Sequence, residues 1–167
     1  MWKQRKTGRP VRAKREPLAM ENRQKAVPIE VATLDGFFRK ICREIGLKYT
    51  AAAVCFVTDR DMKRLNRTYR GKNKTTDVLS FPSEERPKPK SLKRAARALR
   101  GEFLGDIAIS ATVARENAER FGRSVAEEIG VLLLHGVLHL MGYDHESDRG
   151  EMEIIETKLR QQLGLTP

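Results

Sequence analysis

All three histidines of the chain fall within eleven residues, in the stretch HGVLHLMGYDH. His135 and His139 are four residues apart, so on a helix they share one face and lie about 6 Å apart along the axis. Gly142 interrupts the helical pattern, which allows His145 to approach the same point from a loop. Three imidazoles can hold one zinc ion and leave a fourth coordination position open for water, as a catalytic zinc site requires. We therefore predict a metal centre on these three side chains.

The neighbours of the histidines limit the chemistry of this predicted centre. Two histidines on an otherwise aliphatic helix are costly to bury alone, whereas a metal ion satisfies both. Gly136 stands where metallopeptidases of the His-Glu-x-x-His type carry a catalytic glutamate, which argues against a standard metallopeptidase. Activation of water then falls to the metal, with help from a carboxylate. Asp144 is the candidate for this catalytic role, although a turn position or a hydrogen bond to a ligand histidine explains it equally well.

A second group of residues suits the binding of phosphate. Arg70 carries a planar guanidinium that can hold a phosphate in bidentate fashion and stabilise the charge that develops on it. Lys72 and Lys74 follow within four residues and extend the positive charge. Each lysine alone is typical of a solvated loop, but the three cations together predict an RNA-binding track.

The predicted metal ligands need a buried helix, and the sequence provides one. Ser124 and Glu127 form a capping box, and the run from Val125 to Met141 is apolar on nearly every face, so we expect this helix in the core. The other elements follow from hydrophobic periodicity and from capping residues. They are helices capped by Thr33, Asp59, Ser110 and Ser147, and strands over 51–57, 77–82 and 104–109.

Length and charge indicate one domain with basic appendages. The chain has 167 residues, 40% apolar and 33% charged, with a formal net charge of +11. Residues 1–27 hold nine Lys/Arg against two Asp/Glu, and residues 86–100 hold seven against none. We predict a disordered basic arm over 1–27 and a single metallo-hydrolase domain over 28–167. Within this domain we predict a mobile basic insertion at 83–100, which can form one or two helical turns. This segregation favours a polyanion as partner, although solubility alone also explains it.

The apolar stretches, the cysteines and the basic start of the chain indicate where in the cell the protein is expected. No apolar stretch reaches the ~20 residues that a membrane-spanning helix needs, so we expect a soluble protein without membrane contact. Cys42 and Cys55 match no redox or zinc motif and are expected to be reduced core residues, which fits the cytoplasm. The basic start leaves import into an organelle open, and Met20 is an alternative start of translation.

Three segments of the sequence resemble the signature blocks of the YbeY family of bacterial and organellar ribosomal RNA maturation endoribonucleases, and they occur in the order expected of that family. They are LNRTYRGKNKTTDVLSFP, LGDIAIS and HGVLHLMGYDH. The resemblance covers about residues 30–165. It implies an α+β fold with a small mixed four-stranded sheet, about five flanking helices, and the metal site on a buried helix and the loop after it. It also implies one Zn²⁺ at the three histidines and an RNA-cleaving role for Arg70. Thr75 departs from the family, which usually has proline there.

The resemblance further implies a zinc-dependent, single-strand-specific endoribonuclease. Such an enzyme acts in ribosomal RNA processing, at the 3′ end of the small-subunit RNA, and in ribosome quality control. Its expected partners are single-stranded ribosomal RNA and the small ribosomal subunit or its assembly factors, with no small-molecule cofactor. Two other functions stay open from the residues alone. One is a zinc hydrolase acting on peptides, and the other is a non-catalytic RNA-binding assembly factor in which the metal only holds the last two helices together.

Overall fold

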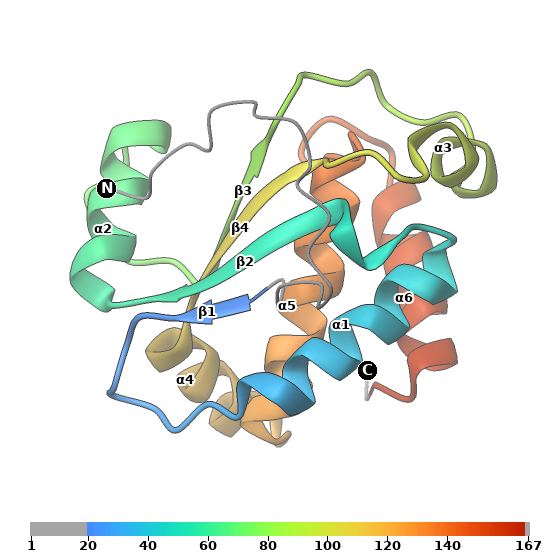
Figure 1. Ribbon diagram of the computed structural model, residues 1–167. Coiled ribbons are helices and arrows are strands. Elements are labelled where there is room, and N and C mark those ends of the chain that lie inside the picture. Colours follow the sequence, from blue (N-terminus) through green and yellow to red (C-terminus); the bar gives the residue numbers. More distant parts are fainter. Residues whose placement is uncertain (1–19, 166–167) are drawn as a thin grey trace, which may run out of the picture.

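The computed structural model describes residues 20–165, and a mixed sheet of four strands lies at their centre. In spatial order the strands are β1 (Met20–Asn22), β2 (Ala52–Val57), β4 (Gly105–Ser110) and β3 (Val78–Pro82). β1 and β4 run parallel to β2, and β3 runs antiparallel to β4. Figure 1 shows the strands crossing the middle of the molecule, with helices on both sides. The predicted small mixed sheet is confirmed.

Six α-helices surround the sheet in the described part of the chain. They are α1 (Val31–Ile45), α2 (Asp59–Arg70), α3 (Leu92–Leu99), α4 (Ala111–Phe121), α5 (Val125–Leu140) and α6 (Glu151–Leu163), with a short 3₁₀ helix at Tyr49–Ala51. The predicted α+β class is confirmed, and the helix beyond the expected five is α3, within the basic insertion. None of these helices is long and apolar enough to cross a membrane.

The two faces of the sheet are covered by different helices. Alternate side chains of a strand point to opposite faces. Val54 and Phe56 of β2 therefore join the large core formed with α1 and α5, whereas Cys55 and Val57 join a small cluster with Met62 of α2. α5 also contacts α1, α4 and α6, which makes it the central helix of the larger layer (Figure 1). The helix that carries two of the histidines is thus buried, as its apolar sequence predicts.

α5 begins and packs as its sequence requires. In its capping box the Glu127 N–H donates to the Ser124 hydroxyl, and the Ser124 N–H donates to the Glu127 carboxylate. Gly136 lies against the sheet, where an added Cβ would lie 2.9 Å from Cδ1 of Ile107. The Ser80 hydroxyl of β3 donates to the Gly136 carbonyl at 3.2 Å and links the sheet to the same helical turn. Gly136 is therefore needed for the close approach of α5 to the sheet.

The predicted disordered arm over 1–27 is wrong for its last residues. Residues 20–22 form β1, which pairs in parallel with β2, and Val27 is buried after it. A strand of three residues is too short to show hydrophobic periodicity, so the sequence pattern does not reveal it. Residues 1–19 of the predicted arm lie outside the described residues.

Three helices begin at residues other than the predicted caps. The N-caps are Glu30, Thr58 and Gly150, in place of the predicted Thr33, Asp59 and Ser147. Glu30 and Gly150 make no side-chain capping hydrogen bond, so a search for capping residues does not find them. The predicted caps Ser110 and Ser124 are confirmed.

The basic insertion at 83–100 contains α3, which packs on the body of the protein. The Ser91 hydroxyl accepts from the Arg94 N–H and caps the helix. Ala96, on the inner face of α3, is only 3% exposed and lies opposite Gly46 at the end of α1. In Figure 1 the chain leaves β3, crosses the top of the view and enters α3. The helical turns predicted for this insertion are therefore present.

Candidate metal centre and cleft

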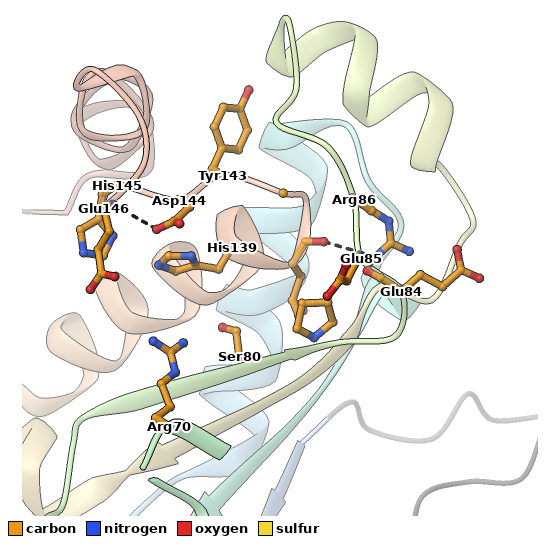
Figure 2. A pocket seen from close by; sticks show the side chains of 13 residues that line it. Arg70, Ser80, Glu84, Glu85, Arg86, His139, Tyr143, Asp144, His145 and Glu146 are labelled. Carbon is orange, nitrogen blue, oxygen red and sulfur yellow. Dashed lines mark hydrogen bonds between the residues drawn. The ribbon is translucent and has the colours of Figure 1, made fainter. Parts of the chain in front are cut away.

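Side chains from four separate segments line one open cleft of about 360 Å³. Arg70 ends α2, Ser80 belongs to β3, and His139 belongs to α5. Asp144 and His145 come from the loop between α5 and α6. Figure 2 shows the Arg70 guanidinium pointing across the cleft toward His139 and Asp144. The structure therefore brings the predicted phosphate-binding arginine to two of the predicted metal ligands.

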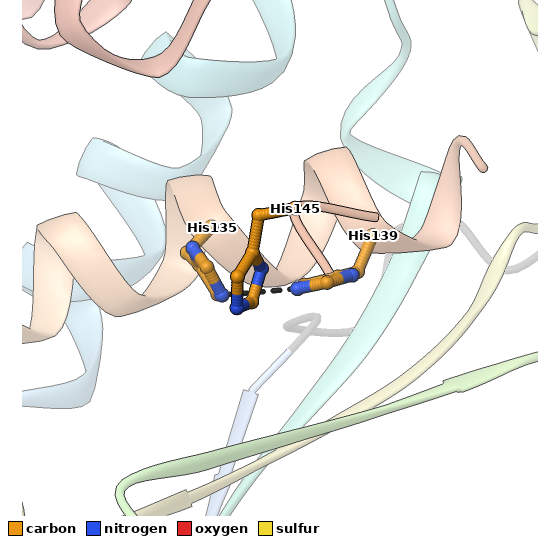
Figure 3. A group of neighbouring side chains, drawn as sticks. All are labelled: His135, His139 and His145. Carbon is orange, nitrogen blue, oxygen red and sulfur yellow. Dashed lines mark hydrogen bonds between the residues drawn. The ribbon is translucent and has the colours of Figure 1, made fainter. Parts of the chain in front are cut away.

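The three histidines converge on one point, as their spacing predicts (Figure 3). His135 and His139 share one face of α5, and their Nε2 atoms are 3.0 Å apart. The ring centroid of His145 lies 5.4 Å from the centroid of each other ring. One ring nitrogen from each residue lies within 4.8 Å of the other two. Gly142, with φ of 102°, forms the predicted break after the helix and turns the chain back toward it.

The protonation state of His139 suits metal binding. Burial, followed by the nearness of His135 and His145, lowers the pKa of His139 to about 4. At neutral pH this ring is therefore uncharged, and one of its nitrogens keeps a lone pair. Only a neutral imidazole can act as a metal ligand, so no proton has to be displaced from this residue.

His135 is held in place by a carboxylate on another helix. Glu156 of α6 is 8% exposed, and its Oε2 lies 3.0 Å from Nδ1 of His135. Because a carboxylate can only accept, Nδ1 carries the proton and Nε2 is left as the ligand atom. Burial alone would raise the pKa of Glu156, but His135 and Arg160 outweigh it and hold the pKa below its usual value. Glu156 was not predicted, because a glutamate on a surface helix 21 residues from His135 carries no distinguishing sequence signal.

The donor set fits a zinc ion. Zinc binds imidazole nitrogen at about 2.0–2.1 Å in a tetrahedral arrangement, which places the ligand nitrogens about 3.3 Å apart. The Nε2 atoms of His135 and His139 are 3.0 Å apart and the whole set lies within 4.8 Å, so small ring rotations satisfy that geometry. Three neutral imidazoles also suit nickel, copper and cobalt. The donor set therefore defines a class of ion rather than one metal.

Arg70 is positioned by the last turn of α2 and by the loop after it. Asn66, buried in α2, donates from Nδ2 to the Lys74 carbonyl at 2.8 Å and closes the loop onto the helix. The ring of Tyr69 packs edge-on against Phe81 of β3, with centroids 5.0 Å apart. These contacts fix the end of α2 beside the sheet, so the Arg70 side chain extends over the cleft.

The other predicted site residues are placed differently from one another. Lys72 and Lys74 are exposed on the loop after α2, and neither lines the cleft. Asp144 does line it, and its Oδ1 accepts from the Glu146 N–H at 3.0 Å. This hydrogen bond lowers the pKa of Asp144, so its carboxylate is ionised at neutral pH. Asp144 thus has the predicted turn role and also a place beside the histidines.

The cleft holds further charged residues that the sequence analysis missed. Glu84, Glu85 and Arg86 line it from the segment that continues β3, and Glu146 lines it from the loop after α5 (Figure 2). No spacing rule relates Glu84, Glu85 and Arg86 to the histidines, because they meet only when β3 packs against α5, whereas Glu146 directly follows His145. The cleft is therefore mixed in charge rather than uniformly basic.

The chain is similar in sequence and in structure to known proteins. A model of the YbeY family, described as endoribonuclease YbeY, matches residues 19–164. An endoribonuclease YbeY from Koribacter versatilis is 38% identical over 143 residues, which cover 86% of this chain and 84% of that relative. Another from Solibacter usitatus is 47% identical over 107 residues, 64% of this chain and 62% of that relative. The solution structure of a Thermotoga maritima protein aligns with a TM-score of 0.51 and 28% identity, covering 80% of each chain.

Proposed function

The chain belongs to the YbeY family of endoribonucleases, and from this premise we propose that it is a metal-dependent enzyme that cuts single-stranded RNA. The reaction takes place in the cleft between Arg70 and the three histidines, and zinc is the proposed ion. The proposal rests on family membership together with the chemistry of the donor set.

One observation carries this proposal: Arg70 faces His139 and His145 across a single cleft (Figure 2). Arg70 and His145 are 75 residues apart in the chain, so no local structural requirement brings them together. A guanidinium and a metal ion on facing walls suit one phosphodiester, because both stabilise negative charge on phosphate oxygens. The arrangement supports phosphoryl chemistry more than any reaction of a neutral substrate.

The residues of the chain have distinct roles in this reaction. Arg70 binds the scissile phosphate and stabilises the charge that develops as the attacking oxygen adds to phosphorus. Asp144, which is ionised, accepts the proton of the attacking hydroxyl or water. Glu156 holds the His135 ring in the orientation that directs Nε2 to the centre. When bound, the metal supplies Lewis-acid polarisation of the phosphate and increases the acidity of water.

Peptide hydrolysis is disfavoured by the surroundings of Gly136. At this position metallopeptidases place a glutamate as general base. Here the added Cβ would point into Ile107 of the sheet and not into the cleft. A general base for peptide cleavage therefore has no place at this helical position.

We propose ribosomal RNA processing as the cellular role, at the 3′ end of the small-subunit RNA and in ribosome quality control. Family membership and the net charge of +11 support this role, because a basic protein is drawn to RNA by counterion release. The proposed partners are single-stranded ribosomal RNA and the small subunit or its assembly factors. The proposed compartment is the cytoplasm.

Incubation of the purified chain with single-stranded RNA, duplex RNA and a peptide tests the function. We expect cleavage of single-stranded RNA by the zinc-loaded chain, none after chelation, and recovery when zinc is restored. His139→Ala should abolish both metal binding and cleavage. A 2′,3′-cyclic phosphate on the products would identify the RNA 2′-hydroxyl as nucleophile. RNA binding without cleavage by the zinc-loaded chain would contradict the proposal and indicate a non-catalytic binding factor.

A further inference from the structure

Five cations on and beside α3 have no partner in the described part of the chain. They are Lys90, Lys93, Arg94, Arg97 and Arg100, and all five are exposed. Among residues 20–165 none of these side chains forms a hydrogen bond or an ion pair. We refer to this set as the α3 basic face. Residues 86–100 contain no acidic residue, and in the described part of the chain the flanking Glu84, Glu85 and Glu102 form no ion pair with these five cations.

The two other cations of the same segment have structural partners. The Arg86 guanidinium donates to the Leu140 carbonyl at the end of α5, at 3.5 Å. Lys88 forms an ion pair of 2.7 Å with Glu151 at the start of α6. These two residues therefore attach the segment on both sides of the loop that carries the third histidine. The α3 basic face thus consists of the cations of this segment that make no such structural contact.

Two of these charges, Lys93 and Arg94, oppose helix stability by their position, whereas Arg97 lies in the last turn, where the helix dipole favours cations. Lys93 and Arg94 lie in the first turn, where the helix dipole favours anions, and this turn contains no acidic residue. Lys93 and Arg97 are four residues apart, a spacing at which like charges repel. The helix is held instead by its inner face, where Ala96 is buried and Leu92 and Leu99 pack against the core. Helix stability therefore does not account for Lys93 and Arg94, which supports an anionic partner outside the chain.

We propose that the α3 basic face is a second RNA-binding surface, which holds the phosphates of a single strand beyond the cleft. This inference rests on the proposed function, because that function supplies RNA as the polyanion. Arg86 lines the cleft and Lys90 begins the α3 basic face four residues later, so at most about 14 Å separates them. One strand can therefore contact both. An anionic membrane fits less well, because the apolar side of α3 is packed against the core and has no side chain to insert.

Salt-dependent RNA binding tests this surface in the full chain. The variant is Lys93→Gln, Arg94→Gln and Arg97→Gln together, which keeps good helix formers and the Ser91 cap. The matched control is Lys25→Gln, Lys40→Gln and Lys158→Gln, which removes the same charge from exposed residues that do not line the cleft. Affinity for a single-stranded RNA of about 16 nucleotides is measured without added metal, so that binding is separated from cleavage.

Each phosphate contact on a single strand contributes about 0.7 to the slope of log affinity against log salt. We therefore expect the slope of the α3 variant to be flatter than that of the wild type by about 2. The ratio of wild-type to variant affinity for RNA should then fall roughly 20-fold between about 50 and about 200 mM salt. The control should keep most of the wild-type slope. A variant of α3 that keeps the three positive charges, with Lys93→Arg, Arg94→Lys and Arg97→Lys together, should bind RNA as the wild type does. Wild-type slope and affinity in the α3 variant would overturn this inference while leaving the proposed function intact. Absence of RNA binding by the wild-type chain would overturn both, and selective loss of binding to phosphatidylserine vesicles would assign the surface to membranes instead.

Discussion

Nδ1 of His135 lies 3.0 Å from Oε2 of Glu156, and this contact joins α5 to α6 at the candidate metal centre. Arg160 holds the other oxygen of the same carboxylate, with Nη2 2.5 Å from Oε1. Glu156 is therefore fixed on both sides, and its orientation decides which nitrogen of His135 faces the other two histidines.

Glu156→Gln should weaken zinc binding by about 10- to 100-fold, because the amide keeps the shape of the side chain but removes its charge. Competition with a chromophoric chelator measures this affinity independently of RNA cleavage. Glu119→Gln, the same change on an exposed position of α4 that lines no pocket beside the histidines, is the control and should bind zinc as the wild type does. Equal affinities in the two variants would show that Glu156 is not needed to orient His135.

Arg70→Ala should reduce the rate of RNA cleavage by about 10²–10³-fold, because in the proposed reaction Arg70 stabilises charge that exists only as the phosphate reacts. Arg70→Lys should recover little of this loss, since an ammonium lacks the planar fork of donors. Single-turnover kinetics separate this effect from RNA binding, and zinc affinity should stay unchanged. Arg67→Ala is the control, one turn earlier on α2, exposed and not lining the cleft. Similar losses in both variants would contradict a specific role for Arg70.

Gly136→Ala should destabilise the protein by about 1–3 kcal/mol, because its Cβ would lie too close to the Ile107 side chain. Urea unfolding measures the change. Adding Ile107→Val removes the Cδ1 atom that lies nearest and should recover part of the loss, so the two changes will not be additive. Gly36→Ala in α1 meets nothing within 4 Å and should instead stabilise by about 0.5–1 kcal/mol.

The buried thiol of Cys42 should make the folded protein less stable at alkaline pH. Burial raises the pKa of Cys42 to about 12, whereas the unfolded thiol ionises near 9. The folded state therefore keeps this proton while the unfolded state loses it, and stability falls as pH rises from about 9 toward 12. This single group should remove about 1.4 kcal/mol between pH 7 and pH 10. Urea unfolding of the wild type and of Cys42→Ala at both pH values isolates the effect. The same difference in free energy of unfolding between the two proteins at pH 7 and at pH 10 would refute it.

Features that depend on neighbouring residues in the chain were predictable from the sequence. The convergence of His135 and His139 needs only helical spacing, and the capping box at Ser124 needs only two residues three apart. Both are present in the structure. Packing of α5 in the core follows in the same way from its uninterrupted apolar sequence.

Features that depend on distant partners were not predictable. β1 is three residues long and is a strand only because β2, about thirty residues later, supplies its hydrogen bonds. Glu156 becomes part of the centre only because α6 packs against α5, and Glu84 enters the cleft only through the turn after β3. Glu156 and Glu84 each occupy an ordinary polar position in their own segment, so their surroundings in the fold decide their roles.

The three histidines all lie between the middle of α5 and the loop that follows it, whereas Arg70 reaches them only across the completed sheet. The three candidate ligands of the ion therefore come from one helix and its adjoining loop, and α6 adds Glu156, which orients His135. Capture of a scissile phosphate requires the long-range pairing of β3 with β4, a slower kind of contact during folding. If the proposed function holds, the ligands of the ion would be brought together mainly by local contacts and the phosphate-binding arginine only by the paired sheet, so RNA cleavage would require the complete fold.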